Sequence, residues 1–315
     1  TIMAYSRGNV RGGIGRQIVK RMIYNFSITN WIILVNVLAF ILIFGGVAVY
    51  NSYYPVNSTI NASNVLIGNI SVSSPADNFI VNNLAFSWDN LVQGRVWTLI
   101  TNMFMHGSFS HLFFNMFSLF FIGNFVERLI GRKRFIAFYL LAGIFAALLF
   151  GVLAFSFGNS LLGERIFSTA STPAVGASGA IFGLLGLLAM LTPRGKVYLL
   201  AGPLIAVIIV FGLSGFVSSG WLTVINLIAT IYIFISIFSL LTFNPKRNKL
   251  ALPIEMPFWI LPIVAIVPLV VIGLFVPLPI GNTAHLGGLI AGLAFGGYLR
   301  IKYKKKIEML NRMLE

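Results

Sequence analysis

The 315-residue sequence contains no cysteine, and only 9% of its residues are charged. The absence of cysteine excludes disulfides, cysteine-ligated zinc, iron–sulfur clusters and thiol catalysis. Soluble globular domains carry about 25% charged residues, so the shortage of charge excludes a soluble globular fold. Apolar sequence takes its place, with 58% hydrophobic residues and a mean hydropathy of +0.92. Because one helical crossing needs about 20 apolar residues, this composition predicts an all-α polytopic membrane protein.

Long apolar runs predict about eight transmembrane helices. They cover residues 31–50, 108–126, 135–157, 178–191, 197–213, 221–243, 257–276 and 283–301. A basic segment at residues 1–30 and another at 302–315 flank the predicted membrane domain, residues 31–301. Within that domain, an Asn/Ser-rich loop at residues 51–107 separates the first two spans.

Basic residues alternate with the predicted spans. All 22 except Arg95 and Arg165 fall in segments that share one side of the membrane if the spans number eight. Loops rich in Lys and Arg mark the cytoplasmic side, so both ends of the sequence are expected there. Topology thus accounts for the net charge of +15, and no nucleic-acid partner is expected. The outer loop carries three glycosylation-type triplets, at Asn57, Asn61 and Asn69, which agrees with an external position.

Polar side chains at membrane depth are costly and indicate a functional site. The sequence has three histidines, and all lie at the outer ends of predicted spans: His106 and His111 at the second, His285 at the last. Asn115 follows His111 by four residues, so the two share a helix face. Ser178 opens the fourth span within a glycine-rich stretch. A single such residue is equally well explained by packing or capping, but their common depth favours a site.

Small residues predict that the fourth and last spans pack side by side, because glycines let two helix backbones approach closely. These glycines are Gly179 and Gly183 in the fourth span, and Gly288 and Gly292 in the last. Ser178 and His285 would then lie at one depth, where a neutral imidazole can take the proton of a serine hydroxyl. None of the seven acidic residues is expected near His285, which favours a Ser–His dyad over a triad. No metal ion or cofactor is needed.

At these residues the sequence resembles the rhomboid family of intramembrane serine proteases, over about residues 88–300. The matching motifs are His106, His111-x-x-x-Asn115, Gly176-x-Ser178-Gly179 and Ala284-His285-x-x-Gly288-x-x-x-Gly292. The resemblance implies a six-helix core, Ser178 as nucleophile and His285 as general base. It also implies that His111, Asn115 and the Ser178 amide form the oxyanion site, and that Phe182 packs on His285. Glu127 and Arg128 match a Glu-Arg pair that closes the second span, interpreted as a structural tether.

Two features depart from the family pattern. The Trp-Arg pair of the first loop is Trp97-Thr98 here, with Arg95 upstream, so the anchoring of this loop is expected to differ. About 90 residues separate the fourth span from the last, so residues 197–243 are interpreted as an inserted helical hairpin.

The leading hypothesis is an endopeptidase that cuts single-pass membrane proteins near the outer face, in the cell membrane of a prokaryote. A catalytically inactive rhomboid-like chaperone is one alternative, although it would be expected to lack Ser178 or His285. A small-molecule transporter with broken helices is another, but the sequence shows no inverted repeat. The substrate and the oligomeric state are left open.

Overall fold

The computed structural model describes residues 26–54, 66–67, 70–71, 74–213, 216–242, 251–275 and 281–314. The helices are α2 (Ile28–Tyr53), α3 (Pro75–Leu84), α4 (Trp88–Val92), α5 (Thr98–Thr101), the 3₁₀ turn η1 (Asn102–Phe104), α6 (Phe109–Ser118), the π-helical turn η2 (Leu119–Gly123), α7 (Asn124–Ile130), α8 (Arg132–Phe157), α9 (Leu161–Phe167), α10 (Ser178–Leu191), α11 (Ala201–Leu213), α12 (Ser219–Thr242), α13 (Leu261–Phe275), α14 (Asn282–Lys302) and α15 (Lys304–Leu314). The strands are β1 (Leu66–Ile67), β2 (Ile70–Ser71), β3 (Lys196–Leu200) and β4 (Pro253–Pro257). The predicted triplets at Asn57, Asn61 and Asn69 lie outside the described residues.

The protein has the all-α polytopic membrane fold that its composition predicted. Four described stretches are long and apolar enough to cross a membrane: Ile28–Tyr53, Phe109–Ile130, Arg132–Phe157 and Gly220–Phe238. Each of the eight predicted spans overlaps a helix. Four of these helices are not among the long apolar stretches, because they are shorter or less apolar: α10, α11, α13 and α14. The total of eight crossings stays a prediction.

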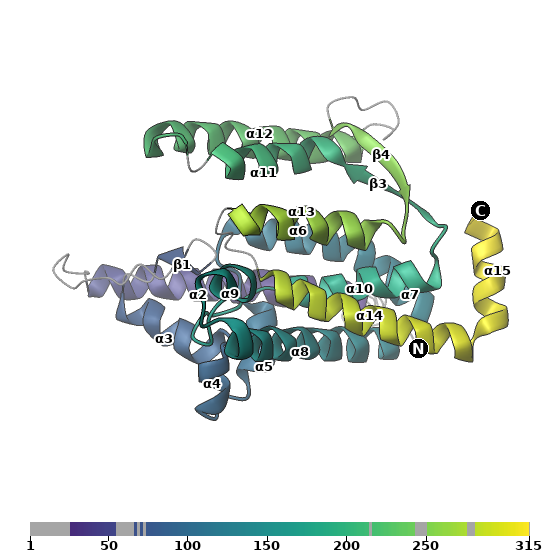
Figure 1. The fold of residues 1–315 in the computed structure, drawn as a ribbon, viewed down its shortest axis with the longest axis horizontal. Coiled ribbons are helices and arrows are strands. Elements are labelled where there is room, and N and C mark those ends of the chain that lie inside the picture. Colours follow the sequence, from purple (N-terminus) through teal and green to yellow (C-terminus); the bar gives the residue numbers. More distant parts are fainter. Residues whose placement is uncertain are drawn as a thin grey trace, which may run out of the picture.

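Helix α10 occupies the middle of the described bundle. Eleven of its 14 residues are buried, whereas α2 buries only three of 26. Helices α8 and α14 run beside α10, and α11 and α12 form the outermost layer on the other side of α13 and α6 (Figure 1). An apolar side chain can face lipid as readily as protein, so the exposed faces of α2 and α12 carry large hydrophobic residues.

A buried carboxylate fixes the start of α2 against the end of α7. Glu127 accepts hydrogen bonds from the backbone N–H of Ile28 (2.9 Å) and of Thr29 (2.8 Å), and from the Thr29 hydroxyl (2.8 Å). Arg132 Nε lies 3.4 Å from the same carboxylate. The helix N-terminus leaves its first N–H groups without intrahelical partners, so a carboxylate there satisfies them. For Glu127, these contacts are those of a structural tether.

The predicted fifth span begins too early. Val197 was expected in a helix, but Lys196–Leu200 form β3, which pairs antiparallel with β4 and aligns Val197 with Met256. Helix α11 starts at Ala201 and has Pro203 in its first turn, where a missing N–H costs nothing. A proline deeper in a helix, such as Pro268 in α13, removes a backbone hydrogen bond and favours a kink. Valine and tyrosine also favour strands, and Lys196 Nζ reaches the Glu255 carboxylate at 2.7 Å across the pair.

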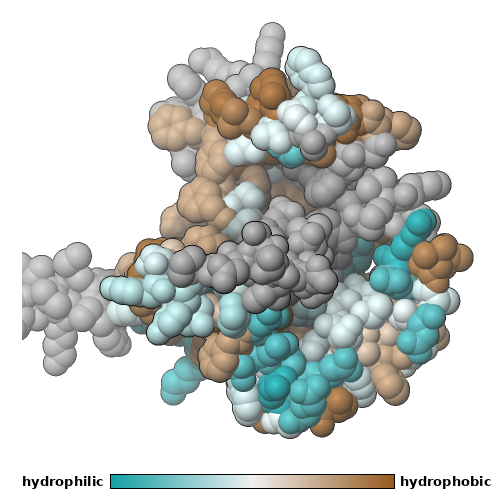
Figure 2. Space-filling model, turned by 90° about the vertical axis from the view of Figure 1, so that its left-hand side faces the viewer, coloured by the Kyte–Doolittle hydropathy of each residue, from teal (hydrophilic) through white to brown (hydrophobic). Residues whose placement is uncertain are grey.

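The two ends of the bundle differ in their surfaces. At one end, residues expected as a basic segment form α15, which runs across the ends of α10 and α14 (Figure 1). At the other end, hydrophilic residues cover the lower part of the face, where α3 and α4 lie, and hydrophobic residues cover its upper edge (Figure 2). That edge belongs to the α11–α12 turn, where Phe216 is 89% exposed and Trp221 is 68% exposed.

Candidate active site

Ser178 and His285 form a hydrogen bond between two helix starts. Ser178 is the first residue of α10, and His285 lies one turn into α14. The distance from His285 Nε2 to Ser178 Oγ is 2.9 Å, and the imidazole is buried. Phe182, one turn after Ser178, stacks on that imidazole with ring centroids 4.2 Å apart and planes 7° apart. The stack restricts the ring to one plane, which aims Nε2 at the serine oxygen.

Close approach of α10 and α14 brings the serine and the histidine together. The glycine seam, defined here as Gly179, Gly183, Gly288 and Gly292, lines this contact. A Cβ atom at Gly288 would overlap the carbonyl oxygen of Gly179, and one at Gly292 would overlap that of Gly183. The two backbones therefore touch without side chains between them. This is the packing that the spacing of small residues indicated.

The second ring nitrogen of His285 has no hydrogen-bond partner among the described residues. Nδ1 is buried, and no donor or acceptor within the described residues reaches it. In a serine triad a carboxylate would accept a hydrogen bond from this nitrogen. The arrangement is therefore a serine–histidine pair whose ring is oriented by Phe182 instead.

Two side-chain nitrogens from α6 face the backbone just before Ser178. Gly176 has a φ of +119°, and a Cβ atom there would lie 2.7 Å from His111 Nε2 and 3.5 Å from Asn115 Nδ2. Only glycine fits, both for its φ and for the space. Asn115 Nδ2 is buried without a partner among the described residues, so this donor is available to a ligand. The first backbone N–H groups of α10, including that of Ser178, also lack intrahelical acceptors.

His106 supports His111 from the side. The two rings meet edge to face with centroids 5.0 Å apart. His106 is 3% exposed, so its imidazole is closed off from solvent. All three histidines of the sequence thus gather around the start of α10.

Sequence reasoning missed two contributors to this arrangement. The Gly176 N–H donates to the backbone oxygen of Asn102 (2.8 Å), which ties the segment before Ser178 to η1. Ala142 and Ala146 of α8 face the glycines of α10, since Cβ atoms at Gly183 and Gly179 would each lie 2.7 Å from theirs. The spacing of the two alanines, four residues apart in an apolar helix, was the available signal.

The first loop is anchored by contacts that no motif predicted. Trp97 Nε1 donates to the backbone oxygen of Asn83 (2.7 Å), and Arg95 Nη1 donates to Asn90 Oδ1 (2.6 Å). Arg95 therefore forms its hydrogen bond within the loop from a position two residues before Trp97, whereas the family pattern has an arginine directly after the tryptophan.

The fold and this polar cluster define a polytopic membrane protein with a hydrogen-bonded serine–histidine pair at the starts of two helices. The sequence model of the Rhomboid domain matches residues 93–238 and 229–302, and the chain belongs to the rhomboid family. It is similar to RHOMBOID-like protein 12, mitochondrial, of Arabidopsis thaliana, with 35% identity over 38% of this chain and 37% of the relative. It is also 38% identical to Rhomboid protease GluP of Bacillus subtilis, over 31% of this chain and 16% of the relative.

An inactive relative matches as well. Inactive RHOMBOID-like protein 8 of Arabidopsis thaliana is 28% identical over 53% of this chain and 45% of its own length. In all three cases the match spans less than half of the relative. Relatives of this chain therefore include a named protease and a named inactive protein.

Proposed function

We propose that the protein is an intramembrane serine endopeptidase with Ser178 as nucleophile and His285 as general base. The observation that carries the proposal is the 2.9 Å hydrogen bond between His285 Nε2 and Ser178 Oγ, held by the glycine seam. A serine hydroxyl is a weak nucleophile until a neighbouring base accepts its proton. This geometry supplies that base within hydrogen-bond reach.

The pair can carry an acyl transfer in two stages. Ser178 Oγ attacks the carbonyl carbon of the substrate peptide bond while its proton passes to His285 Nε2. The tetrahedral intermediate then collapses, the C–N bond breaks, and the imidazolium gives the proton to the leaving amine. Water attacks the acyl-enzyme in the second stage, with the same nitrogen as base, and Ser178 recovers its proton.

The negative oxygen of the intermediate needs fixed donors. His111, Asn115 and the Ser178 amide are the donors proposed for it, since the two side chains converge on Gly176 next to Ser178. The role proposed for Gly176 is to leave that space open. His106 positions His111, and Phe182 positions His285.

Single-pass membrane proteins are the proposed substrates, because the pair lies at membrane depth among helices. We place the basic segments, residues 1–30 and 302–315, on the cytoplasmic side and Ser178 towards the outer face. The basic residues of the α7–α8 junction, the α10 end and α15 support this orientation. The start of α8 and the end of α14 lie next to each other, since Arg134 Nη2 donates a hydrogen bond to the Tyr303 hydroxyl at 2.8 Å. Their basic residues therefore lie at one end of the bundle. We place the inserted hairpin outside the catalytic core.

A serine-reactive fluorophosphonate probe tests the proposal directly. The wild-type protein should be labelled at Ser178 and should cleave a transmembrane reporter. Ser178→Ala and His285→Ala should each abolish both signals, and the double variant should be no worse than either, because neither group works alone. Ser52→Ala, an exposed serine outside the site, is the matched control and should behave as wild type.

Substantial cleavage by a well-folded Ser178→Ala variant would contradict the assignment. A wild-type protein that neither reacts with the probe nor cleaves any reporter would favour the inactive, chaperone-like alternative; a named inactive relative in Arabidopsis shows that loss of activity has a precedent among similar proteins.

A further inference from the structure

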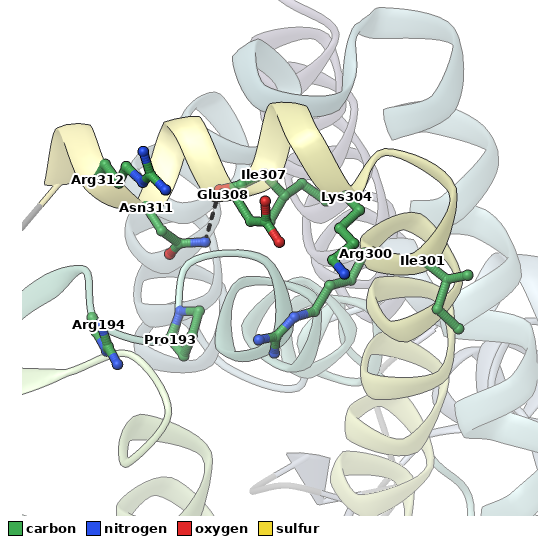
Figure 3. A pocket seen from close by; sticks show the side chains of 9 residues that line it. All are labelled: Pro193, Arg194, Arg300, Ile301, Lys304, Ile307, Glu308, Asn311 and Arg312. Carbon is green, nitrogen blue, oxygen red and sulfur yellow. Dashed lines mark hydrogen bonds between the residues drawn. The ribbon is translucent and has the colours of Figure 1, made fainter.

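A pocket of about 620 Å³ opens at the end of the molecule opposite Ser178. It lies where the chain leaves α10, at the junction of α14 and α15 (Figure 3). Nine residues line it: Pro193, Arg194, Arg300, Ile301, Lys304, Ile307, Glu308, Asn311 and Arg312. None of them belongs to the proposed catalytic machinery, so the pocket requires a separate explanation.

Its walls are fixed by contacts with the core. Asn311 Nδ2 donates to the backbone oxygen of Leu191, the last residue of α10, at 3.0 Å. Ile307 packs against the main hydrophobic core from the same helix. The α14 end is held by the hydrogen bond between Arg134 and the Tyr303 hydroxyl. The pocket is therefore formed by anchored elements, which lowers the cost of ordering it around a ligand.

Its charge favours an anion. Four basic residues line the pocket against one acidic residue, Glu308, so the lining carries a net charge of +3. The basic side chains are Arg194 from the segment after α10, Arg300 from α14, and Lys304 and Arg312 from α15. Three of the four are arginines, whose planar donors match the oxygen atoms of a phosphate group. Figure 3 shows Arg300 and Lys304 on one side of the pocket and Arg194 on the other side, beyond Pro193.

An apolar wall adjoins these charges. Ile301 lines the pocket and is 84% exposed, at the point where the apolar helix α14 ends. A free inorganic anion gains nothing from such a side chain. A phospholipid would place its phosphate among the basic groups and its glycerol and acyl chains along Ile301 and α14.

We propose that this pocket binds the phosphate of an anionic phospholipid headgroup at the cytoplasmic surface. Basic pockets at the cytoplasmic ends of membrane helices suit anionic headgroups, and that leaflet is negatively charged. The bound lipid would tie α15 to the bases of α10 and α14.

Binding of soluble dihexanoyl-phosphatidylglycerol to the full chain in a zwitterionic detergent tests the proposal. Phosphatidylcholine of the same chain length and inorganic phosphate are the comparison ligands. The double variant Arg300→Gln/Lys304→Gln removes two charges that line the pocket, one from α14 and one from α15. The control double variant Lys305→Gln/Lys306→Gln removes two charges of α15 that do not line it. The first should weaken phosphatidylglycerol binding by about tenfold or more, and the second by less than about twofold.

A third variant, Ile301→Gln, keeps every charge. It should weaken phosphatidylglycerol binding and leave that of inorganic phosphate unchanged. Melting temperatures of all variants show that each one is folded. Equal losses for the two double variants would reduce the effect to surface charge and overturn the proposal. So would equal affinity for phosphatidylcholine, or inorganic phosphate binding as tightly as the anionic lipid.

Discussion

The glycine seam and the outer hairpin, defined as α11 and α12, use glycine in opposite settings. In the seam, a Cβ atom at Gly288 or Gly292 would overlap a backbone carbonyl of α10. In the outer hairpin, Gly212 and Gly220 have no atom within 4 Å of such a Cβ. Glycine thus permits a close backbone contact in the seam, whereas in the outer hairpin no such contact with described atoms requires it. Only in the seam does the contact determine the geometry of the proposed catalytic side chains.

The strength of attachment also differs. The seam joins two helices along their length, whereas the outer hairpin meets α6 through Phe234, whose ring centroid is 4.6 Å from that of Phe113. Strands β3 and β4 tie the base of the hairpin. Four changes test whether the glycine seam matters more to the proposed chemistry than the outer hairpin does, as the difference in packing suggests.

Among the point substitutions in the two regions, the largest effect is expected from Gly288→Ala and Gly292→Ala. The added methyl group meets a backbone oxygen that cannot rotate away, so α14 must shift from α10. Overpacking of this kind costs about 1–3 kcal/mol, and a 1 Å displacement of a catalytic group can cost about 10²-fold in rate. Melting temperature and reporter cleavage measure the two consequences.

Gly212→Ala is the matched control. It should leave cleavage unchanged and the melting temperature equal or slightly higher, because alanine favours a helix. Equal losses in the seam and hairpin variants would remove the distinction between the regions.

Asn115→Ala tests α6, which lies between the two regions. Loss of one oxyanion donor is expected to lower turnover on the order of 10²-fold. Labelling of Ser178 by the small probe should fall less than in His285→Ala, because the serine and its base are untouched. An enzyme with full activity after this change would reduce Asn115 to a packing residue.

Removing the outer hairpin should have a smaller effect. Leu200 pairs with Pro253, so an Asn-Gly turn can replace residues 201–252 and leave β3 and β4 joined as a tight hairpin. Deleting two helices preserves the orientation of α14, and at least partial cleavage should remain. Because the chain lacks cysteine, single introduced cysteines can report the side of each segment.

Deletion of only one hairpin helix is the contrasting variant. It should invert or trap the last spans and abolish activity. If the two-helix deletion inserts and folds but cleaves no substrate, the outer hairpin belongs to the catalytic machinery.

The smallest effect is expected from Phe234→Ala. Phe234 contacts two rings of α6, Phe109 and Phe113, and each aromatic contact contributes about 0.5–1.5 kcal/mol. Both contacts lie outside the serine–histidine pair, so cleavage should change by less than about threefold. Leu227→Ala, on an exposed position of the same helix, is the control and should change nothing. A loss comparable to that of Asn115→Ala would show that the hairpin positions α6.

The sequence predicted much of this architecture because membrane helices leave strong signals. Apolar length gave the positions of α2, α8 and α10, and small-residue spacing gave the α10–α14 contact. These features depend on local composition, which is visible in one chain.

Other features depend on partners distant in the sequence and were missed. Pairing of β3 with β4 joins residues about 57 positions apart, as in the Tyr198–Glu255 alignment. The hydrogen bond from Gly176 to Asn102 leaves no pattern in the sequence. Residues 302–315 were expected only as a basic segment, and helix α15 was not predicted, because its charge masks the few apolar residues, such as Ile307, that anchor it.

The length of α10 sets how deep the proposed chemistry occurs. Its 14 residues span about 21 Å at 1.5 Å per residue. Its Leu191 end is fixed beside the basic residues of α15, so the orientation proposed above puts that end at the inner boundary of the hydrocarbon layer. In a layer about 30 Å thick, Ser178 then lies about 9 Å below the outer boundary. Water for the second stage of the reaction must descend that far, and a substrate must unwind its helix by several residues below the surface.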